Sequence, residues 1–236
     1  MIKGSTFAQQ VLRFNNNLSC ESLNLPTTFK LINPFREEQR ELVQEITKRF
    51  YEKYYSDIRP RRLILGSSPA RRGSAITGVP FEDAQYLEQE TGIKLNGVYV
   101  NRASSNFLFE VIKRYGGRKK FYANFYMNFV CPLGIVASNS KGGEVNCNYY
   151  ESKELQKALT PFIIDAIHQQ ISFGIDTSVC FCIGSGKNYI FLSQINKQYH
   201  FFENIIPLEH PRFITQYNAK HKDVFLEKYL LSLCSG

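Results

Sequence analysis

The residues with the clearest chemical potential lie in one loop, between positions 65 and 83, directly after a short apolar strand. Arg71 and Arg72 supply positive charge, and Phe81 supplies a flat apolar face. Three glycines and two prolines within these nineteen residues let the backbone approach a ligand closely. Cations next to a ring are suited to a ligand that combines a polyanion with a planar group. We therefore interpret the loop as part of an active site.

Two further segments with unusual chemistry follow predicted strands. One contains Cys131 and Pro132, and the other runs from position 207 to 212 and contains His210 and Arg212. The carboxyl ends of parallel strands meet at one edge of a sheet, where ligands bind in open α/β folds. We expect one cleft to collect all three segments.

The elements that must position these segments alternate between helix and strand. Apolar periodicity predicts helices over 36–55, 83–91, 151–173, 187–195 and 214–233, and a helix capped by Ser104 or Ser105 that ends at 116–117. It predicts strands over 62–65, 125–135, 178–183 and 201–206, and a surface loop over 138–148. This alternation favours a three-layer α/β/α fold with a central, mainly parallel sheet.

Length and composition are consistent with one globular domain. With 236 residues and 43% hydrophobic content, we expect a single domain over 1–236, in which 1–60 form a helical extension packed on the rest. The net charge of +8 mildly favours a nucleic acid or another anionic partner. Six cysteines without a regular interval are expected to be reduced. Positions 1–19 hold no continuous apolar stretch, so we expect a cytoplasmic protein without a signal peptide or membrane anchor.

Several short motifs occur in an order that carries a family resemblance. Gly66-x-x-Pro69 follows the first strand, and TGVPF over 77–81, CPL over 131–133 and His210-Pro211 come after it. From about Arg61 to its end, the chain resembles the single-strand-selective monofunctional branch of the uracil-DNA glycosylase superfamily. The resemblance implies a three-layer α/β fold and an enzyme that hydrolyses the bond between a damaged base and deoxyribose. It implies neither a metal nor another cofactor.

The resemblance also implies catalytic roles. Phe81 matches the phenylalanine that stacks on the extruded base, and His210 matches the donor to the leaving base. Ser68 stands where the family usually has an asparagine that holds the attacking water. Asp83 is a third catalytic candidate, because a carboxylate could activate water or stabilise the sugar cation. The same aspartate is also well placed to cap the next helix.

The base-reading position departs from the family pattern. Two residues before CPL, where the family usually has an asparagine, this chain has Phe129, with Asn128 one place earlier. Neighbouring strand residues face opposite sides, so Asn128 can substitute only if a bulge intervenes. The residues predicted to bind the base are Gly66, Pro69, Ala70, Phe81, Asn128 and Phe129.

A basic border around the cleft would hold the phosphates of DNA. The glycine-rich turn at 184–186 lacks the residues of a nucleotide-binding P-loop, but its amides at a helix start could hold one phosphate. Residues after His210 could enter the DNA, or could instead pack at the start of the last helix. The residues predicted to bind DNA are Arg71, Arg72, Gly186, Lys187, Arg212 and Phe213.

The sequence thus predicts a monofunctional DNA glycosylase that removes uracil or a related deaminated base during base excision repair. Its expected partner is DNA that contains a damaged base, and we expect it to act as a monomer. The alternative is a lesion-binding protein that kept the pocket and lost hydrolysis, because Ser68 and Phe129 depart from the family pattern. A nucleotide hydrolase on a similar sheet is a third reading.

Overall fold

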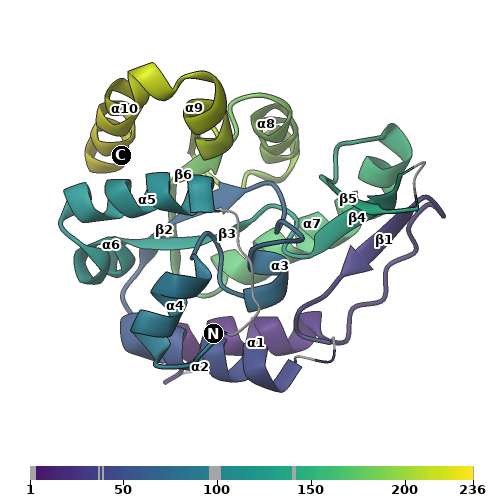
Figure 1. The fold of residues 1–236 in the computed structure, drawn as a ribbon, viewed down its shortest axis with the longest axis horizontal. Helices are drawn as coiled ribbons and strands as arrows, with labels where there is room; N and C mark the ends of the chain where they lie inside the picture. Colours follow the sequence, from purple (N-terminus) through teal and green to yellow (C-terminus); the bar gives the residue numbers. More distant parts are fainter. Residues whose placement is uncertain (1–3, 37, 39, 96–101, 140–141, 236) are drawn as a thin grey trace.

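A four-stranded parallel sheet forms the centre of the computed structural model, which describes residues 4–36, 38, 40–95, 102–139 and 142–235 (Figure 1). The strands are β2 (Arg61–Gly66), β3 (Phe125–Phe129), β6 (Ile175–Ile183) and β7 (Asn204–Leu208), and their order is β3-β2-β6-β7. Because every neighbouring pair is parallel, the carboxyl ends of all four strands lie at the same edge. The predicted parallel sheet is therefore confirmed.

One face of this sheet is covered by α1 (Phe7–Leu18), α2 (Arg40–Tyr54) and α7 (Lys153–Ile171). The ring of Tyr126 on β3 shows how these layers meet. It contacts Phe7 of α1 at 5.2 Å, Tyr51 of α2 at 6.4 Å and Phe173, just after α7, at 6.0 Å between centroids. Aromatic rings therefore fill this half of the core.

The opposite face is covered by α5 (Arg102–Tyr115) and α10 (Lys222–Ser235). Ile64 and Met127 from the sheet, Leu108 from α5 and Tyr229 from α10 surround one small apolar gap between these layers. All four side chains are at most 4% exposed. Helices thus cover both faces of the sheet, which confirms the predicted three-layer α/β/α fold.

A second, antiparallel sheet was not predicted from the sequence. It contains β1 (Phe29–Ile32), β4 (Gly134–Ser138) and β5 (Glu144–Cys147), in the order β1-β4-β5. The strand predicted over 125–135 is therefore wrong, because it divides into β3 and β4 around a turn at Cys131-Pro132, where proline offers no amide donor. The surface loop predicted over 138–148 is also wrong, since its second half is β5. Three of the four β5 residues are exposed, so no apolar pattern marks this strand.

Several helix boundaries differ from the prediction, and two of the differences change how a helix begins or is divided. The terminal helix predicted over 214–233 divides into α9 (Pro211–Tyr217), a 3-10 turn (Ala219–His221) and α10. Helix α5 begins at Arg102, so Ser104 and Ser105 lie inside it and are not its caps. The remaining helices are α3 (Ser74–Thr77), α4 (Ala84–Thr91), α6 (Arg118–Asn124) and α8 (Lys187–Tyr199).

The first sixty positions contain the predicted helix, α2, and two elements that the sequence did not place, helix α1 and strand β1. They are joined to the sheet by Arg61, whose side chain is fully buried. Its guanidinium lies 4.8 Å from the ring centroids of both Phe7 and Tyr55, and its Nη1 is 3.0 Å from Asp57 Oδ1. A buried cation needs such partners to offset its lost hydration. The division into one domain with an extension stays a prediction.

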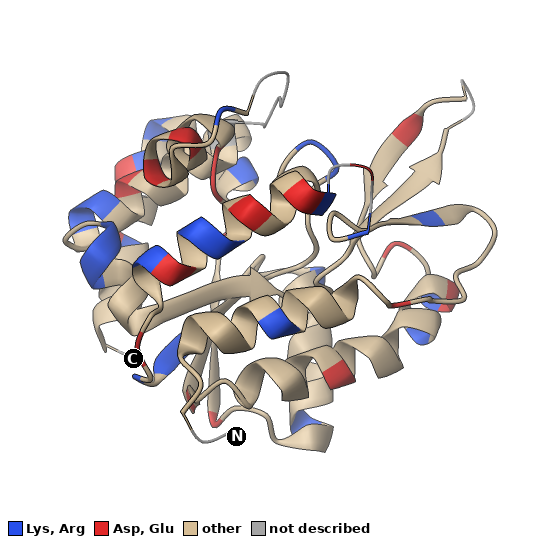
Figure 2. Cartoon of the chain, turned by 90° about the horizontal axis from the view of Figure 1, so that it is seen from below, with Lys and Arg blue, Asp and Glu red and all other residues tan. Residues whose placement is uncertain are grey.

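Charged residues are spread over the surface. Lys and Arg occur on several elements and are mixed with Asp and Glu (Figure 2). The net charge therefore does not by itself mark a binding face, and a nucleic-acid contact must be argued from individual side chains. In the part of the chain that the structure describes, no helix combines the length and the apolar character that crossing a membrane requires.

The cap of α4 gives a test of local stability. Asp83 Oδ1 accepts a hydrogen bond from the Gln85 amide at 2.8 Å, as a helix cap does. We expect Asp83→Ala to lower the free energy of unfolding by about 1 kcal/mol, and Asp83→Asn to lower it by a few tenths at most, because asparagine caps equally well. Urea denaturation measures both. Equal losses in the two variants would contradict the capping role.

Candidate active site

A cavity of about 340 Å³ opens at the carboxyl edge of the parallel sheet, a volume in the range of small-molecule sites. It collects residues from the ends of β2, β3 and β7, from the first turns of α5 and α9, and from the second sheet. The predicted residues Gly66, Ser68, Ala70, Arg72, Phe81, Phe129, His210 and Arg212 line it, together with Ser67, Gly73, Ser74, Glu82, Ser104, Ser105, Asn146, Asn148 and Tyr150.

The ring of Phe81 is held close to the end of β2. Its centroid lies 5.0 Å from that of Phe129, and the two planes are inclined by 30°. A Cβ on Gly66 would lie 2.5 Å from Phe81 Cζ, closer than side-chain atoms can come. The ring therefore rests on a glycine at one side, and lines the cavity where a planar ligand could stack on it.

The backbone of Phe81 is strained, with φ at +62°, a conformation that bulky residues rarely adopt. Two sets of contacts hold it. The Phe81 amide donates to Ser74 Oγ at 3.1 Å, and the next residue, Glu82, is 4% exposed and paired with Arg118 at 2.6 Å. Strain of this kind persists only where neighbours fix it, so the ring is a preorganised part of the site.

Glu82 is the carboxylate that lines this cavity. One oxygen accepts from Arg118 and the other from the Tyr122 hydroxyl. Burial raises the pKa of Glu82, and the nearby Arg118 guanidinium opposes that shift. Because both oxygens are engaged away from the cavity centre, we assign Glu82 to the support of the Phe81 loop.

His210 caps helix α9 with its side chain. Its Nδ1 accepts a hydrogen bond from the Arg212 amide at 3.1 Å. Burial, and then the charge of Arg212, hold the pKa of His210 below its ordinary value. The neutral ring therefore carries its proton on Nε2, because the bond made by one nitrogen fixes the tautomer of the other. His210 can offer one neutral N–H donor to a ligand in the cavity.

Ser68 is 8% exposed and does not stand alone. Its Oγ donates to Asn148 Oδ1 at 3.1 Å, and Ser67 Oγ donates to the same oxygen at 2.7 Å. Asn148 follows β5, and its amide group lies among the cavity residues. One asparagine from the second sheet is thus bound to both serines of the predicted loop.

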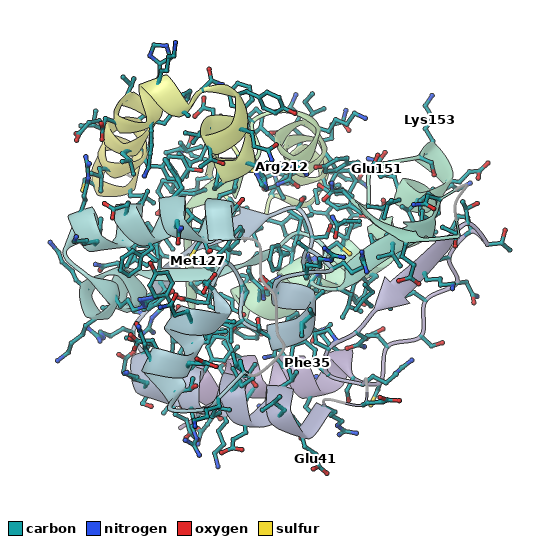
Figure 3. All side chains as sticks on the ribbon, in the orientation of Figure 1. Phe35, Glu41, Met127, Glu151, Lys153 and Arg212 are labelled. Atoms are coloured by element: carbon teal, nitrogen blue, oxygen red, sulfur yellow. The ribbon has the colours of Figure 1, made fainter. Side chains whose placement is uncertain are left out.

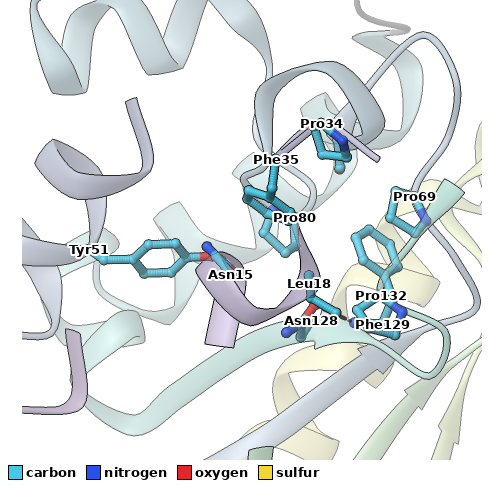
Figure 4. A pocket seen from close by; sticks show the side chains of 12 residues that line it. Asn15, Leu18, Pro34, Phe35, Tyr51, Pro69, Pro80, Asn128, Phe129 and Pro132 are labelled. Atoms are coloured by element: carbon cyan, nitrogen blue, oxygen red, sulfur yellow. Dashed lines mark hydrogen bonds between the residues drawn. The ribbon is translucent and has the colours of Figure 1, made fainter. Parts of the chain in front are cut away.

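Asn128 lies outside the cavity. The register of β2 with β3 runs without a shift from Arg62 to Gly66, so no bulge turns Asn128 toward the Phe129 side. Its amide donates to the Tyr126 hydroxyl at 2.8 Å, and its Oδ1 accepts from the Phe129 amide. It lines a separate small cavity between β3 and α1, which Asn15 and Leu18 of α1 also line (Figure 4). This placement gives no support to the predicted base contact of Asn128.

Two other residues with a predicted base-binding or catalytic role also lie away from the main cavity. Pro69 lines the same small cavity as Asn128 (Figure 4). Asp83 is 2% exposed, and its side chain caps α4. The catalytic role of Asp83 stays a prediction, and its placement supports the capping role that the sequence also suggested.

The residues predicted to bind DNA surround the cavity in part. Arg72 and Arg212 line it. Arg212 lies at the end of α9 that faces the middle of the molecule (Figure 3). Glu41 and Lys153, by contrast, project from the periphery (Figure 3). The Arg71 amide donates to Asn146 Oδ1 at 2.8 Å. Phe213 is 46% exposed next to His210. Its neighbour in α9, Ile214, is fully buried.

Gly186 and Lys187 lie at the start of α8, directly after β6, and both are exposed. They occupy the same edge of the sheet as the cavity but do not line it. Their predicted contact with a phosphate therefore stays a prediction.

The sequence interpretation missed the residues that the second sheet contributes. Asn146, Asn148 and Tyr150 line the cavity from β5 and the turn after it. Their segment was predicted as a loop, because most residues of β5 are exposed and give no apolar pattern typical of a strand. Two asparagines at a spacing of two residues are the one feature that could have suggested a wall of the site. In the described residues no cluster of histidine, cysteine and carboxylate groups could hold a metal ion.

The carboxyl edge of the parallel sheet thus presents a fixed aromatic ring and an imidazole donor to one cavity. The family model for the uracil DNA glycosylase superfamily matches residues 52–234, which is most of the chain. The chain belongs to this superfamily.

Over its whole length, the chain is similar to SMUG2 from Pedobacter heparinus. The two are 43% identical, the TM-score is 0.92, and the match covers 100% of this chain and 98% of the other. A comparison with curated protein sequences finds no significant match. The resemblance predicted from the sequence is confirmed, and so is the glycosylase-like fold.

The contact between Gly66 and Phe81 can be tested directly. Gly66→Ala would force the Phe81 ring to move, so we expect the free energy of unfolding to fall by about 1–3 kcal/mol. The double variant with Phe81→Leu should recover part of this loss, because leucine leaves room for the new methyl group. Urea denaturation of Gly66→Ala, Phe81→Leu and the double variant measures the effect. An unchanged stability in Gly66→Ala would show that the ring is not confined.

Proposed function

We propose that the protein is a monofunctional DNA glycosylase that hydrolyses the bond between deoxyribose and uracil, or a related deaminated base. One observation carries the proposal: Phe81 and His210, from distant parts of the chain, line one cavity. A stacking ring and a neutral N–H donor are what an extruded pyrimidine needs for binding and for departure. Membership of the superfamily supports the same reaction.

Base extrusion comes first. Taking a base out of the stack costs a few kcal/mol, and contacts inside the pocket and with phosphates outside it offset that cost. Phe81 offers one face for stacking. The partly exposed Phe213, beside His210 on the first turn of α9, is suited to fill the space that the base leaves in the duplex.

Bond cleavage then develops positive charge on the sugar and negative charge on the base. The C1′–N1 bond breaks, its electron pair leaves with the base, and the base oxygens share the charge. The Nε2–H of His210 can donate to such an oxygen, which stabilises the transition state more than the ground state. Water then forms the new bond to C1′ and gives up one proton to solvent.

The chemistry is expected to be hydrolytic without a covalent enzyme intermediate. No lysine among the described residues lines the cavity, so an amine attack on the sugar has no candidate there. Ser68 is the predicted contact for the attacking water. Its hydroxyl is no base at neutral pH, and an electron-poor sugar needs orientation of the water more than its deprotonation.

Binding to DNA is supported by the arginines around the cavity. Arg72 and Arg212 lie on its wall, and Arg71 and Lys187 are placed on the same edge of the sheet. Contacts of this type fix the position of a nucleic acid without reading its sequence. The monomeric state and the cytoplasmic location stay predictions.

The first experiment compares oligonucleotides that contain uracil, xanthine or hypoxanthine, each incubated with the protein and then treated with alkali. Strand breaks at the modified base support the proposal. Tight binding without an abasic product would select the alternative of a lesion-binding protein. Protection from unfolding by free nucleotides alone would favour a nucleotide hydrolase.

His210 provides the sharpest prediction. We expect His210→Ala to lower the single-turnover rate of uracil release by about a hundred- to a thousandfold, as loss of one transition-state donor does elsewhere. His221→Ala is the matched control, because His221 is exposed in the 3-10 turn and does not line the cavity. A rate in His210→Ala near that of the unaltered protein would refute the assigned role.

Because Arg72 and Arg212 line the cavity, we expect the affinity for DNA to depend on the salt concentration. Each neutralised phosphate contributes about 0.9 to the slope of log affinity against log salt on duplex DNA, and about 0.7 on a single strand. We expect Arg72→Gln to reduce the slope by about that amount. Lys197→Gln removes the same charge near the carboxyl end of α8, away from the cavity, and should leave the slope unchanged. Fluorescence anisotropy at several salt concentrations measures both variants, and equal slopes would contradict the predicted contact.

A further inference from the structure

The cluster of Ser67, Ser68 and Asn148 has a specific arrangement that the reaction above does not explain. Both hydroxyls donate to one acceptor, Asn148 Oδ1, at 2.7 and 3.1 Å. From this geometry we infer that Asn148 is a positioning residue, which fixes the proton of Ser68 and thereby sets how the attacking water binds. The inference rests on the proposed glycosylase function.

The first step is a count of donors and acceptors. A serine hydroxyl has one proton and two lone pairs, and a side-chain carbonyl oxygen has two lone pairs. In this cluster the two serine protons occupy both lone pairs of Asn148 Oδ1. Ser68 Oγ then has no proton left to give, so it faces the cavity as an acceptor.

The second step concerns the rotation of the hydroxyl. A free hydroxyl can turn either its proton or a lone pair toward a bound water. The first arrangement uses one lone pair of the water oxygen, and the second leaves both lone pairs available for attack. A water that donates to Ser68 Oγ keeps its own lone pairs directed elsewhere. Asn148 thus selects the productive orientation, although it does not have to touch the sugar.

The amide nitrogen of Asn148 can make a further hydrogen bond, to a ligand in the cavity. Among the described residues, none accepts a hydrogen bond from Asn148 Nδ2, and the residue lines the cavity. One of its protons can therefore reach the same water or a base oxygen. It cannot read the N–H edge of a base, because Oδ1 is already fully used.

The third step is that, among the described residues that line the cavity, no carboxylate has an oxygen left over to bind the water. Glu82 lines the cavity, but its two oxygens accept from Tyr122 and Arg118. The Asp83 carboxylate caps α4. Orientation by hydroxyl and amide groups is therefore the means that the cavity wall offers for handling the water.

The antiparallel sheet gives Asn148 its fixed place. Asn148 directly follows Cys147, the last residue of β5, and its carbonyl accepts from the Glu151 amide at 3.1 Å. Two residues earlier, Asn146 Oδ1 accepts from the Arg71 amide at 2.8 Å and joins β5 to the loop of the serines. These contacts hold the asparagine against the loop before any ligand arrives.

Single-turnover cleavage of a uracil oligonucleotide tests the inference. We expect Asn148→Ala to lower the rate constant by about a hundredfold, the cost of a misplaced reacting group, with little change in the protein concentration that gives half the maximal rate. Asn148→Asp keeps an acceptor for both hydroxyls, so its rate should stay within about tenfold of the unaltered protein. Combining Ser68→Ala with Asn148→Ala should slow the reaction no further than Ser68→Ala alone, because the two residues act as one unit.

Asn17→Ala is the matched control, because Asn17 is an exposed asparagine on α1. If Asn148→Ala does not fold, Asn148→Ser replaces it, since the shorter side chain keeps a polar turn but does not reach both hydroxyls. Three results would overturn the inference: a rate in Asn148→Ala like that of the control, a rate in Asn148→Asp as low as in Asn148→Ala, or additive losses in the double variant. If the unaltered protein releases no base at all, the proposed function fails, and this inference fails with it.

Discussion

The close contact between Phe81 and Gly66 is the constraint on which the site depends. A ring can lie over the end of β2 only because residue 66 has no side chain, and the strained backbone of Phe81 has to be held there. Ser74 binds its amide, and the buried pair of Glu82 and Arg118 fixes the next residue. Ser74, Glu82 and Arg118 therefore hold the Phe81 ring in place.

Two sheets with different tasks build the cavity. The parallel sheet brings the ends of β2, β3 and β7 to one edge, which places Phe81 near His210. The antiparallel sheet adds a polar wall that contains Asn146 and Asn148. The apolar and donor parts of the site thus come from one sheet and the amide parts from the other, and the contacts of Asn146 and Asn148 with the loop after β2 join them.

The parts of the fold that the sequence predicts are those with strong local patterns. Apolar runs mark β2 and β6, and the cap at Asp83 and the stop at Gly92 mark α4. The rule that parallel strand ends meet was enough to predict that Phe81 and His210 line one cavity. Strand β5 could not be found in this way, because its pairing with β4 stabilises a segment that has little apolar character of its own. Asn148 was missed for the same reason.

The alternation of side chains along β3 explains the remaining difference at the base-reading position. Asn128 and Phe129 must face opposite sides, but the sequence does not say which side belongs to the cavity. The register shows that Phe129 packs behind Phe81 and that Asn128 faces α1. Of these two residues, Phe129 lines the cavity and Asn128 does not.

The buried guanidinium of Arg61 has a consequence for where this protein can be divided. The superfamily match begins at residue 52, yet Phe7 covers one side of that guanidinium and the ring of Tyr126 as well. A fragment that begins at residue 52 would lack Phe7 and would therefore expose Tyr55, Tyr126 and one side of the Arg61 guanidinium to water. The segment that the family model matches is thus shorter than the part of the chain that packs around Arg61.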